Sequence, residues 1–370
     1  MNCRSCGGKT HRILDLGDQP LASNLLADPA DPFDTYPLNV EYCQECHLGQ
    51  LGEMVPPGKM FNEYLFYSRA SAPVVSEAKK LVDETCRTLL VYDNLFVMEI
   101  ASNDGYLLQH YLKKGIPVLG IDPARGPANE AALHGVPTIQ DYFDLDLAKT
   151  LPKANVIHAQ NVLAHVPYLN DFVAGIAACL KPNGVAIIEV PYFGDLLRDG
   201  RFDTVYHEHS YYFTLQSLTM LFNRNGLGIR HWKHIDTLGG SLRLWVSRGP
   251  NWAGTCEPSP LDLQKKADAV RTGLREQLAR LGPIWGYGAP AKATVMLNFC
   301  ELNAKQILRI ADTTPAKQGM YIPGTGIEVC AALDAPDYVC IFAWNYAEFI
   351  RRERLPGVKT FTPYDLDIRC

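Results

Sequence analysis

The chain has 370 residues and a mass of 41.2 kDa, which is enough for two or three domains of ordinary size. Apolar residues make up 47% of it and charged residues 20%, as is usual for a soluble globular protein. The net charge of −5 argues against a nucleic-acid or anionic-membrane surface, because either would need a surplus of basic residues. We therefore expect no nucleic-acid partner and no membrane partner.

The first residues show no cationic segment followed by an apolar run, so the sequence predicts no secretory signal. No stretch approaches the roughly 20 apolar residues that a membrane-spanning helix needs. The expected location is the cytoplasm. In that reducing compartment the eleven cysteines are expected to be metal ligands and small buried side chains.

Two CxxC pairs stand near the start of the chain and supply the predicted metal ligands Cys3, Cys6, Cys43 and Cys46. A CxxC in a tight turn directs two thiolates to one point, and two such turns form the tetrahedral sulfur set that suits Zn²⁺. Four thiolates leave no open coordination position, so the predicted zinc is structural and stabilises a small domain over 1–68. Free thiols, a redox pair, and His11 or His47 in place of one thiolate are the alternatives.

The middle of the chain alternates between helix-like and strand-like segments. An amphipathic helix is predicted over 70–90, and an apolar strand over 95–100 leads into the small-residue turn 101–105. The next strand, 117–121, ends at Asp122. An acidic residue about 20 positions after such a turn is suited to accept hydrogen bonds from ribose hydroxyls.

The same alternation continues with helices at 127–134 and 169–180 and strands at 154–159 and 184–190. Strands and helices at this spacing are typical of an α/β fold with a doubly wound parallel sheet. Ligands bind such sheets at the carboxyl ends of the strands.

The turn after the first of these strands lacks the GxGxxG pattern, because Ala101 stands where the first glycine would be. An adenosine with a sulfonium needs no phosphate cradle, and Glu99 beside the turn would repel a phosphate. Glu99 and Asp122 favour a cationic ligand with a ribose, namely S-adenosylmethionine, over NAD or a core without ligand. The candidate cofactor residues are Glu99, Ala101, Asn103, Asp104, Gly105, Asp122, Asp141 and Asn161.

The last third repeats the strand–turn–helix pattern. A charged helix is predicted over 261–280, and a short strand then leads into the glycine turn 286–290. Lys292 opens the next helix, where its charge and the helix N-terminus suit a diphosphate; a purely structural turn is the alternative. A further βαβ unit begins with strand 307–311, so this third is also predicted to be Rossmann-like.

Eight motifs are spread over nearly the whole chain: CxxC…CxxC, EIASNDGYLL, NVLAHV, YHEHSYYF, LGGSLR, GYGAPAK, AKQGMYIPGTG and AWNY. Together they resemble the C-methyltransferases that act on nucleotide-linked ketosugars. The resemblance implies a zinc-binding domain over 1–68, a methyltransferase Rossmann domain over 69–253 and a Rossmann-like domain over 254–370 that binds the nucleotide sugar. It also implies S-adenosylmethionine at Glu99–Gly105 and Asp122.

Methylation of carbon needs a base that removes a proton and a group that holds the enolate charge. Histidine suits the first task, since its reference pKa near 6.5 leaves a neutral ring at pH 7. The resemblance favours His209 as the base, with Tyr206 and Glu208 as supporting polar groups. His165 is the candidate that polarises the keto oxygen or contacts the sugar, while His207 is expected to be a bystander.

The predicted substrate contacts are Tyr64, Tyr67, Lys292, Trp344 and Asn345. Core packing is the alternative for the two tyrosines, and His231 and His234 are expected to be structural. An O- or N-methyltransferase and a non-catalytic, zinc-stabilised nucleotide-binding module are the rival functions. The sequence does not identify the sugar, the methylated carbon or the nucleotide, which could be dTDP or GDP. It also leaves the oligomeric state open, and a monomer is one of the options.

Overall fold

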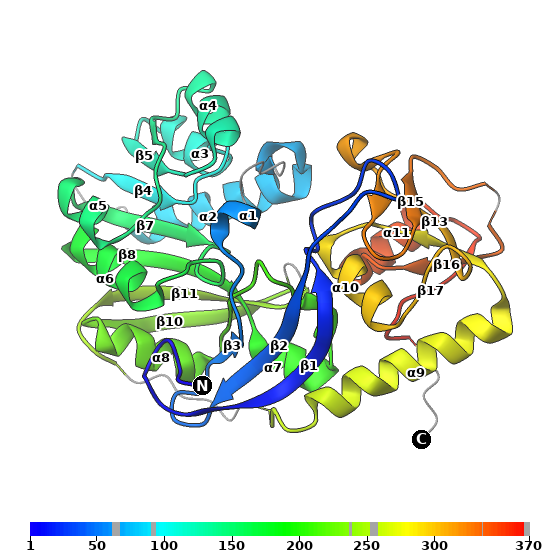
Figure 1. The fold of residues 1–370 in the computed structure, drawn as a ribbon. Coiled ribbons are helices and arrows are strands. Elements are labelled where there is room, and N and C mark those ends of the chain that lie inside the picture. The colour runs from blue at the N-terminus through cyan, green and yellow to red at the C-terminus, as the bar shows by residue number, and fades with distance from the viewer. Residues whose placement is uncertain (61–66, 90–93, 237–238, 252–257, 335, 366–370) are drawn as a thin grey trace.

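The computed structural model describes all residues except 61–66, 90–93, 237–238, 252–257, 335 and 366–370. Three sheets organise the described residues, with four, seven and six strands (Figure 1). The α/β class predicted from the sequence is confirmed. No helix in the described part of the chain has both the length and the apolar character that crossing a bilayer requires.

The four-stranded sheet combines the N-terminal region with a segment from the middle of the chain. Its strands follow the order β1-β2-β3-β9, and they are β1 (Thr10–Pro20), β2 (Thr35–Cys43), β3 (Gly49–Leu51) and β9 (Tyr211–Tyr212). The last strand belongs to the YHEHSYYF motif, so this motif is part of the N-terminal sheet. A single apolar core joins β1 and β2 to the helices Leu263–Leu281 and Ala291–Phe299 of the last third, and the blue strands in Figure 1 accordingly lie between the two larger sheets.

The seven-stranded sheet follows the order β10-β11-β8-β7-β4-β5-β6. Its strands are β4 (Val97–Ile100), β5 (Val118–Ile121), β6 (Thr138–Ile139), β7 (Ala154–Gln160), β8 (Leu180–Pro191), β10 (Leu227–Ile235) and β11 (Ser241–Arg248). The five strands from β4 to β8 are parallel, but β10 and β11 are antiparallel, so the sheet is mixed where the sequence predicted parallel strands. The link over 236–240 between these two strands is too short for the crossover that a parallel connection needs.

Helices cover both faces of this sheet because its strands alternate in side-chain direction. Val97 of β4 packs with α2 and α3, whereas Met98 packs with α6 and α8 on the opposite face. The helices of this region are α2 (Ala72–Leu89), α3 (Leu108–Leu112), α4 (Arg125–Leu133), α5 (Leu145–Thr150), α6 (Leu169–Cys179), α7 (Phe193–Asp199) and α8 (Leu215–Arg224), after the short α1 (Pro57–Met60). Strand order reverses between β4 and β7, and ligands of such sheets bind outside the carboxyl ends at this switch point.

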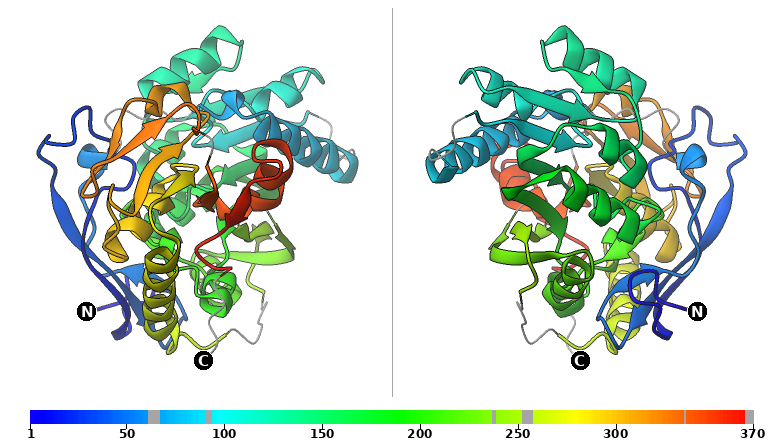
Figure 2. Two further views of the ribbon diagram at one scale, coloured as in Figure 1. Left: turned by 90° about the vertical axis from the view of Figure 1, so that its right-hand side faces the viewer. Right: turned by 90° about the vertical axis from the view of Figure 1, so that its left-hand side faces the viewer.

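The six-stranded sheet has the order β14-β15-β13-β12-β16-β17, with β14 antiparallel to β15. Its strands are β12 (Ile284–Tyr287), β13 (Ile307–Ala311), β14 (Tyr321–Ile322), β15 (Ile327–Cys330), β16 (Tyr338–Ile341) and β17 (Lys359–Phe361), and its helices are α9 (Leu263–Leu281), α10 (Ala291–Phe299) and α11 (Ala347–Glu353). The long helix α9 crosses one side of the molecule (Figure 2), and its buried residues recur at helical spacing.

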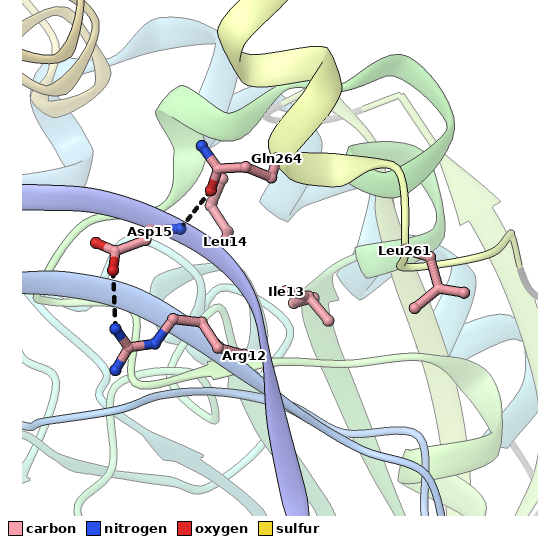
Figure 3. A pocket seen from close by; sticks show the side chains of 6 residues that line it. All are labelled: Arg12, Ile13, Leu14, Asp15, Leu261 and Gln264. Atoms are coloured by element: carbon pink, nitrogen blue, oxygen red, sulfur yellow. Dashed lines mark hydrogen bonds and ion pairs between the residues drawn. The ribbon is translucent and has the colours of Figure 1, made fainter.

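A cavity of about 340 Å³ lies between β1 and the start of α9 (Figure 3). Gln264 accepts a hydrogen bond from the backbone N–H of Asp15 at 2.7 Å there, and Arg12 pairs with the Asp15 carboxylate. None of the predicted site residues lines this cavity. The candidate site therefore has to be built from the strand ends instead.

Candidate active site and metal centre

The four predicted cysteines form one cluster in which all Sγ atoms lie within 4.8 Å of one another. The Sγ atoms of Cys3 and Cys46 are 3.5 Å apart, and those of Cys6 and Cys43 are 3.4 Å apart. The hydrogen bond between the thiols of Cys3 and Cys46 lowers the pKa of Cys3 and raises that of Cys46, so Cys3 is the first of the two to form a thiolate. Four sulfur ligands at one point fit a closed, structural Zn²⁺ site.

The two histidines considered as alternative ligands lie outside this cluster. His47 Nδ1 forms a 2.6 Å hydrogen bond with the Tyr42 hydroxyl, and the His47 backbone has a φ of 61° that closes the second cysteine turn. The ring of His11 packs edge-on against that of Tyr42, with ring centroids 5.8 Å apart. Among the described residues, the ligand set therefore consists of the four cysteines alone.

The turn that follows β4 is built from left-handed backbone conformations. Ala101, Asn103 and Gly105 have φ values of 57°, 50° and 72°. Side chains other than glycine rarely adopt such conformations, and they cluster where a backbone must approach a ligand. The turn lies at the carboxyl end of β4, beside the switch point of the sheet.

Asp122, at the end of β5, is held by this turn. Its Oδ2 accepts a hydrogen bond from the N–H of Asn103 and its Oδ1 accepts one from the N–H of Ala124, both at 2.8 Å. Burial raises the pKa of the carboxyl. Each carboxylate oxygen keeps lone pairs for further donors, so the group is oriented to accept the hydroxyls of a ribose.

Glu99 is buried within β4, and neither of its carboxylate oxygens has a hydrogen-bond partner among the described residues. Burial, together with the charges of Asp122 and Asp104, raises its pKa well above the usual value. Asp104 Oδ1 and Ser102 Oγ are likewise buried without a partner in the described part of the chain. Unpaired acidic and hydroxyl groups at one strand end fit a cation that also carries hydroxyls, as S-adenosylmethionine does.

A segment that sequence reasoning missed braces this turn. The N–H of Ser68 donates to Asn103 Oδ1 at 3.0 Å, and the N–H of Arg69 donates to Asp104 Oδ2 at 2.8 Å. Arg69 Nε also donates to the Asp104 carbonyl oxygen. The segment lies before the predicted helix and has no periodicity, so no local signal marked it. It holds the side chains of the turn in place before any ligand binds.

The remaining predicted cofactor and linker residues take different places. Asn161 follows β7 with a φ of 54°, and its N–H donates to the Glu189 carbonyl oxygen at 2.8 Å. Asp141 is exposed just beyond β6. Tyr67 is partly exposed, and its hydroxyl lies directly beside the backbone of Gly126 in α4. Tyr64 lies outside the described residues.

Replacing Ala101 with glycine should stabilise the protein. The left-handed backbone of Ala101 costs about 1–2 kcal/mol, and glycine would lose about 0.5–1 kcal/mol of this gain through its greater freedom when unfolded. We expect the free energy of unfolding in urea to rise by about 0.5–1 kcal/mol. Ala178→Gly, within helix α6, is the control and should lower it by about 1 kcal/mol. A loss of stability in Ala101→Gly would contradict the strain argument.

Tyr206 and His209 form a hydrogen-bonded pair whose proton positions follow from their partners. His209 Nδ1 lies 3.1 Å from the Thr204 carbonyl oxygen, which can only accept, so Nδ1 carries the hydrogen. His209 Nε2 is therefore the acceptor, and the Tyr206 hydroxyl donates to it at 2.9 Å. Burial and the neighbouring His165 ring lower the pKa of His209 well below its usual value. The ring is accordingly a neutral base at pH 7.

Three further polar groups were predicted near this pair, namely His165, Glu208 and His207, and their surroundings differ. The rings of His165 and His209 meet edge-on with centroids 4.8 Å apart, and burial lowers the pKa of His165 to about 4. Burial raises the pKa of Glu208, although hydrogen bonds from Ser23 oppose the effect. His207 turns away and donates from Nε2 to the Tyr36 carbonyl oxygen at 3.2 Å, which ties the motif to β2.

Buried neutral histidines should make stability depend on pH. Burial lowers the pKa of His158 to about 3 and that of His165 to about 4, whereas the unfolded chain titrates near 6.5. Between these values the unfolded state binds more protons than the native state, so the free energy of unfolding should fall as pH is lowered from about 6.5 to 4. Unfolding in urea at several pH values measures this. His158→Gln should reduce the slope and the exposed His134→Gln should not; equal slopes in both would contradict the assignment.

The predicted substrate residues of the last third meet the middle region at one point. Lys292 Nζ donates to Asn345 Oδ1 at 3.0 Å and lies 4.0 Å from the centre of the Trp344 ring. The Arg201 guanidinium lies 4.5 Å from the same ring. Trp344 Nε1 donates to Asp203 Oδ2 at 2.8 Å. Arg201 and Asp203 were not predicted, because only the fold brings them to the C-terminal sheet.

Lys292 has no carboxylate within ion-pair distance among the described residues. Burial lowers its pKa to about 8, although the charge of Asp203 opposes the effect. The charge of Lys292 also contributes, as the smallest of four causes, to the low pKa of His209. A buried amine with no carboxylate in ion-pair contact is suited to bind an anion.

Comparison with known proteins gives the class. Three family profiles match the chain: a putative zinc binding domain at residues 3–61, a methyltransferase domain at 79–231 and a C-methyltransferase C-terminal domain at 261–358. The C-methyltransferase NovU of Streptomyces niveus is 31% identical over an alignment 388 positions long, gaps included, which covers 95% of this chain and 92% of that enzyme. The chain belongs to the C-methyltransferase family. It is an S-adenosylmethionine-dependent enzyme whose second cofactor is the Zn²⁺ of the four-cysteine cluster.

Other known proteins align with only part of this C-methyltransferase. The ubiquinone biosynthesis O-methyltransferase of Bartonella tribocorum is 27% identical over 27% of the chain and 43% of that enzyme. One solved structure is the magnesium protoporphyrin IX methyltransferase from Synechocystis PCC 6803 with bound SAH. Its alignment covers 46% of this chain and 83% of that protein, with 16% sequence identity and a TM-score of 0.38.

Proposed function

We propose that this C-methyltransferase methylates a carbon next to the ketone of a nucleotide-linked deoxyketosugar, with His209 as the base. The observation that carries the proposal is the neutral His209, whose Nε2 is the acceptor atom and accepts a hydrogen bond from the Tyr206 hydroxyl. A base and an oxyanion donor side by side are what enolate formation needs.

The hydrogen bond between Tyr206 and His209 suggests the sequence of proton transfers in enolate formation. In the absence of substrate, the Tyr206 hydroxyl donates a hydrogen bond to the lone pair of His209 Nε2, which is then not free to accept a proton. When a keto oxygen comes within reach, Tyr206 donates to it instead and frees Nε2. The base then takes the proton from the adjacent carbon, and the electron pair of the broken C–H bond forms the enolate, which the Tyr206 hydroxyl stabilises. S-adenosylmethionine supplies the methyl group that this carbon receives.

The residues of the last third support a nucleotide diphosphate in the substrate. Lys292 stands in the first turn of α10 without a carboxylate partner in the described part of the chain, and its charge acts on His209. A diphosphate at Lys292 would direct the attached sugar toward His209, on which the charge of Lys292 acts. We accordingly assign the nucleotide sugar to the domain over 254–370, the cofactor to 69–253 and the zinc to 1–68.

The deciding experiment incubates the holoenzyme with S-adenosylmethionine and a panel of nucleotide-linked 4-ketosugars in deuterated water. We expect a mass gain of one methylene in one sugar, together with deuterium entering the carbon next to the ketone. Methylation at oxygen or nitrogen, without deuterium at carbon, would contradict the enolate mechanism. Tight binding of nucleotide and cofactor without turnover of any ketosugar would favour the non-catalytic module.

A further inference from the structure

The zinc cluster and the proposed base are joined by a short path of backbone contacts. The turn between Cys43 and Cys46 closes with two hydrogen bonds, from the N–H of His47 to the Cys43 carbonyl and from the N–H of Cys43 to the Leu48 carbonyl. Strand β3 begins at Gly49, three residues after Cys46. The metal-binding turn therefore sets the position and direction of β3.

Strand β3 in turn holds the segment that carries His209. Gly49 pairs with Tyr212 and Gln50 pairs with Tyr211, and the N–H of Leu51 donates to the Ser210 carbonyl oxygen at 3.0 Å. The N–H of Ser210 donates to the Ala164 carbonyl oxygen at 2.8 Å. The residue after His209 is thus fixed on one side to β3 and on the other to the residue before His165.

The cluster is also packed into the interior of the middle region. Three of its cysteines share an apolar core with Tyr211, Phe213 and residues of α6 and α8. Arg224 donates to the Ser5 carbonyl oxygen at 2.9 Å, and the Thr214 hydroxyl donates to the His47 carbonyl oxygen at 3.1 Å. Both cysteine turns are therefore attached to the elements that follow the catalytic motif.

We propose that the zinc site is a positioning element of the active site, which holds His209 and His165 at their working distance through β3 and β9. The proposal rests on the proposed function in that it takes His209 as the base. The turn after β4 and Asp122 make none of these contacts, so the cofactor end of the site is independent of the metal. Loss of the link should impair proton removal and leave cofactor binding intact.

A glycine substitution breaks the link without touching a metal ligand. A Cβ on Gly49 would lie 2.8 Å from the Phe193 ring and 3.0 Å from Tyr212 Cβ, so Gly49→Ala must shift either β9 or Phe193, whose N–H donates to the Phe213 carbonyl oxygen just beyond β9. Gly228→Ala is the control, because Gly228 also lies in a strand and is more crowded still, at 2.5 Å from the Gly249 carbonyl oxygen, but belongs to the outer strand β10.

We expect Gly49→Ala to keep one zinc per chain and to bind S-adenosylhomocysteine, by calorimetry, within about twofold of the unchanged enzyme. Backbone amides of 210–212 should exchange with deuterium faster, and both turnover and deuterium entry into the ketosugar should fall at least about tenfold, since a displacement of about 1 Å can cost about 100-fold. Gly228→Ala should change none of these. Removal of zinc from the whole 370-residue chain with a chelator should reproduce the faster exchange of 210–212.

Two results would overturn the positioning role. The first is an unchanged rate of amide exchange at 210–212, either in Gly49→Ala or in the zinc-depleted enzyme. The second is faster exchange there with unchanged turnover. If the unchanged holoenzyme shows no deuterium entry with any ketosugar, the proposed function fails, while amide exchange and cofactor affinity still decide whether zinc orders this segment.

Discussion

Replacing His209 with asparagine should lower kcat about 1,000-fold and leave the affinity for S-adenosylhomocysteine within about twofold. Asparagine keeps a donor for the Thr204 carbonyl oxygen but has no basic nitrogen to accept a proton. Steady-state kinetics with a ketosugar that the enzyme methylates measures kcat. Deuterium entry into the ketosugar should fall by the same factor, because it reports proton removal alone.

His207→Asn is the matched control for this variant. His207 lies in the same motif but donates to the Tyr36 carbonyl oxygen, away from the pair of His209 and Tyr206. It should keep most of the activity, since asparagine can also donate to that carbonyl. Wild-type deuterium entry in His209→Asn would show that another group is the base.

The second large effect is expected on stability, from Arg243→Met. Arg243 donates from Nε and from its terminal guanidinium nitrogen to Glu189 Oε2, at 3.0 and 2.9 Å, and both side chains are buried. Removing the cation leaves a buried carboxylate without its charge partner, which costs about 3–5 kcal/mol. Unfolding in urea, followed by circular dichroism, measures the loss.

Two further variants separate this explanation from simple loss of packing. The double variant Glu189→Gln with Arg243→Met removes the stranded charge and should regain a large part of the loss. Lys79→Met breaks an exposed pair with Asp83 and should cost less than about 1 kcal/mol. A single variant Arg243→Met as stable as Lys79→Met would show that the buried pair contributes little.

Sequence reasoning succeeded where the signal was local. The spacing of Cys3, Cys6, Cys43 and Cys46 carries its own geometry, and the structure brings the four Sγ atoms together. The strand before Ala101 and the acidic residue at Asp122 also follow from short-range patterns. These patterns placed the predicted cofactor residues of β4 and β5 at one strand edge.

Contacts that join distant parts of the chain were not predicted from the sequence. Strand β9 has only two residues and no periodicity, so nothing local marked its pairing with β3. Arg69, Arg201 and Asp203 acquire their roles only from the packed fold. The direction of the hydrogen bond between Tyr206 and His209 follows from a carbonyl oxygen that the sequence could not place.

The late arrival of β9 has a consequence for synthesis of the chain on the ribosome. The first three strands of the N-terminal sheet are complete at Leu51, but their fourth strand emerges only with Tyr211 and Tyr212. Until then β3 presents unpaired backbone groups, and such an open edge can recruit a strand from another nascent chain. A fragment that stops before residue 200 would keep that edge exposed, and it should be prone to aggregation even with its metal bound.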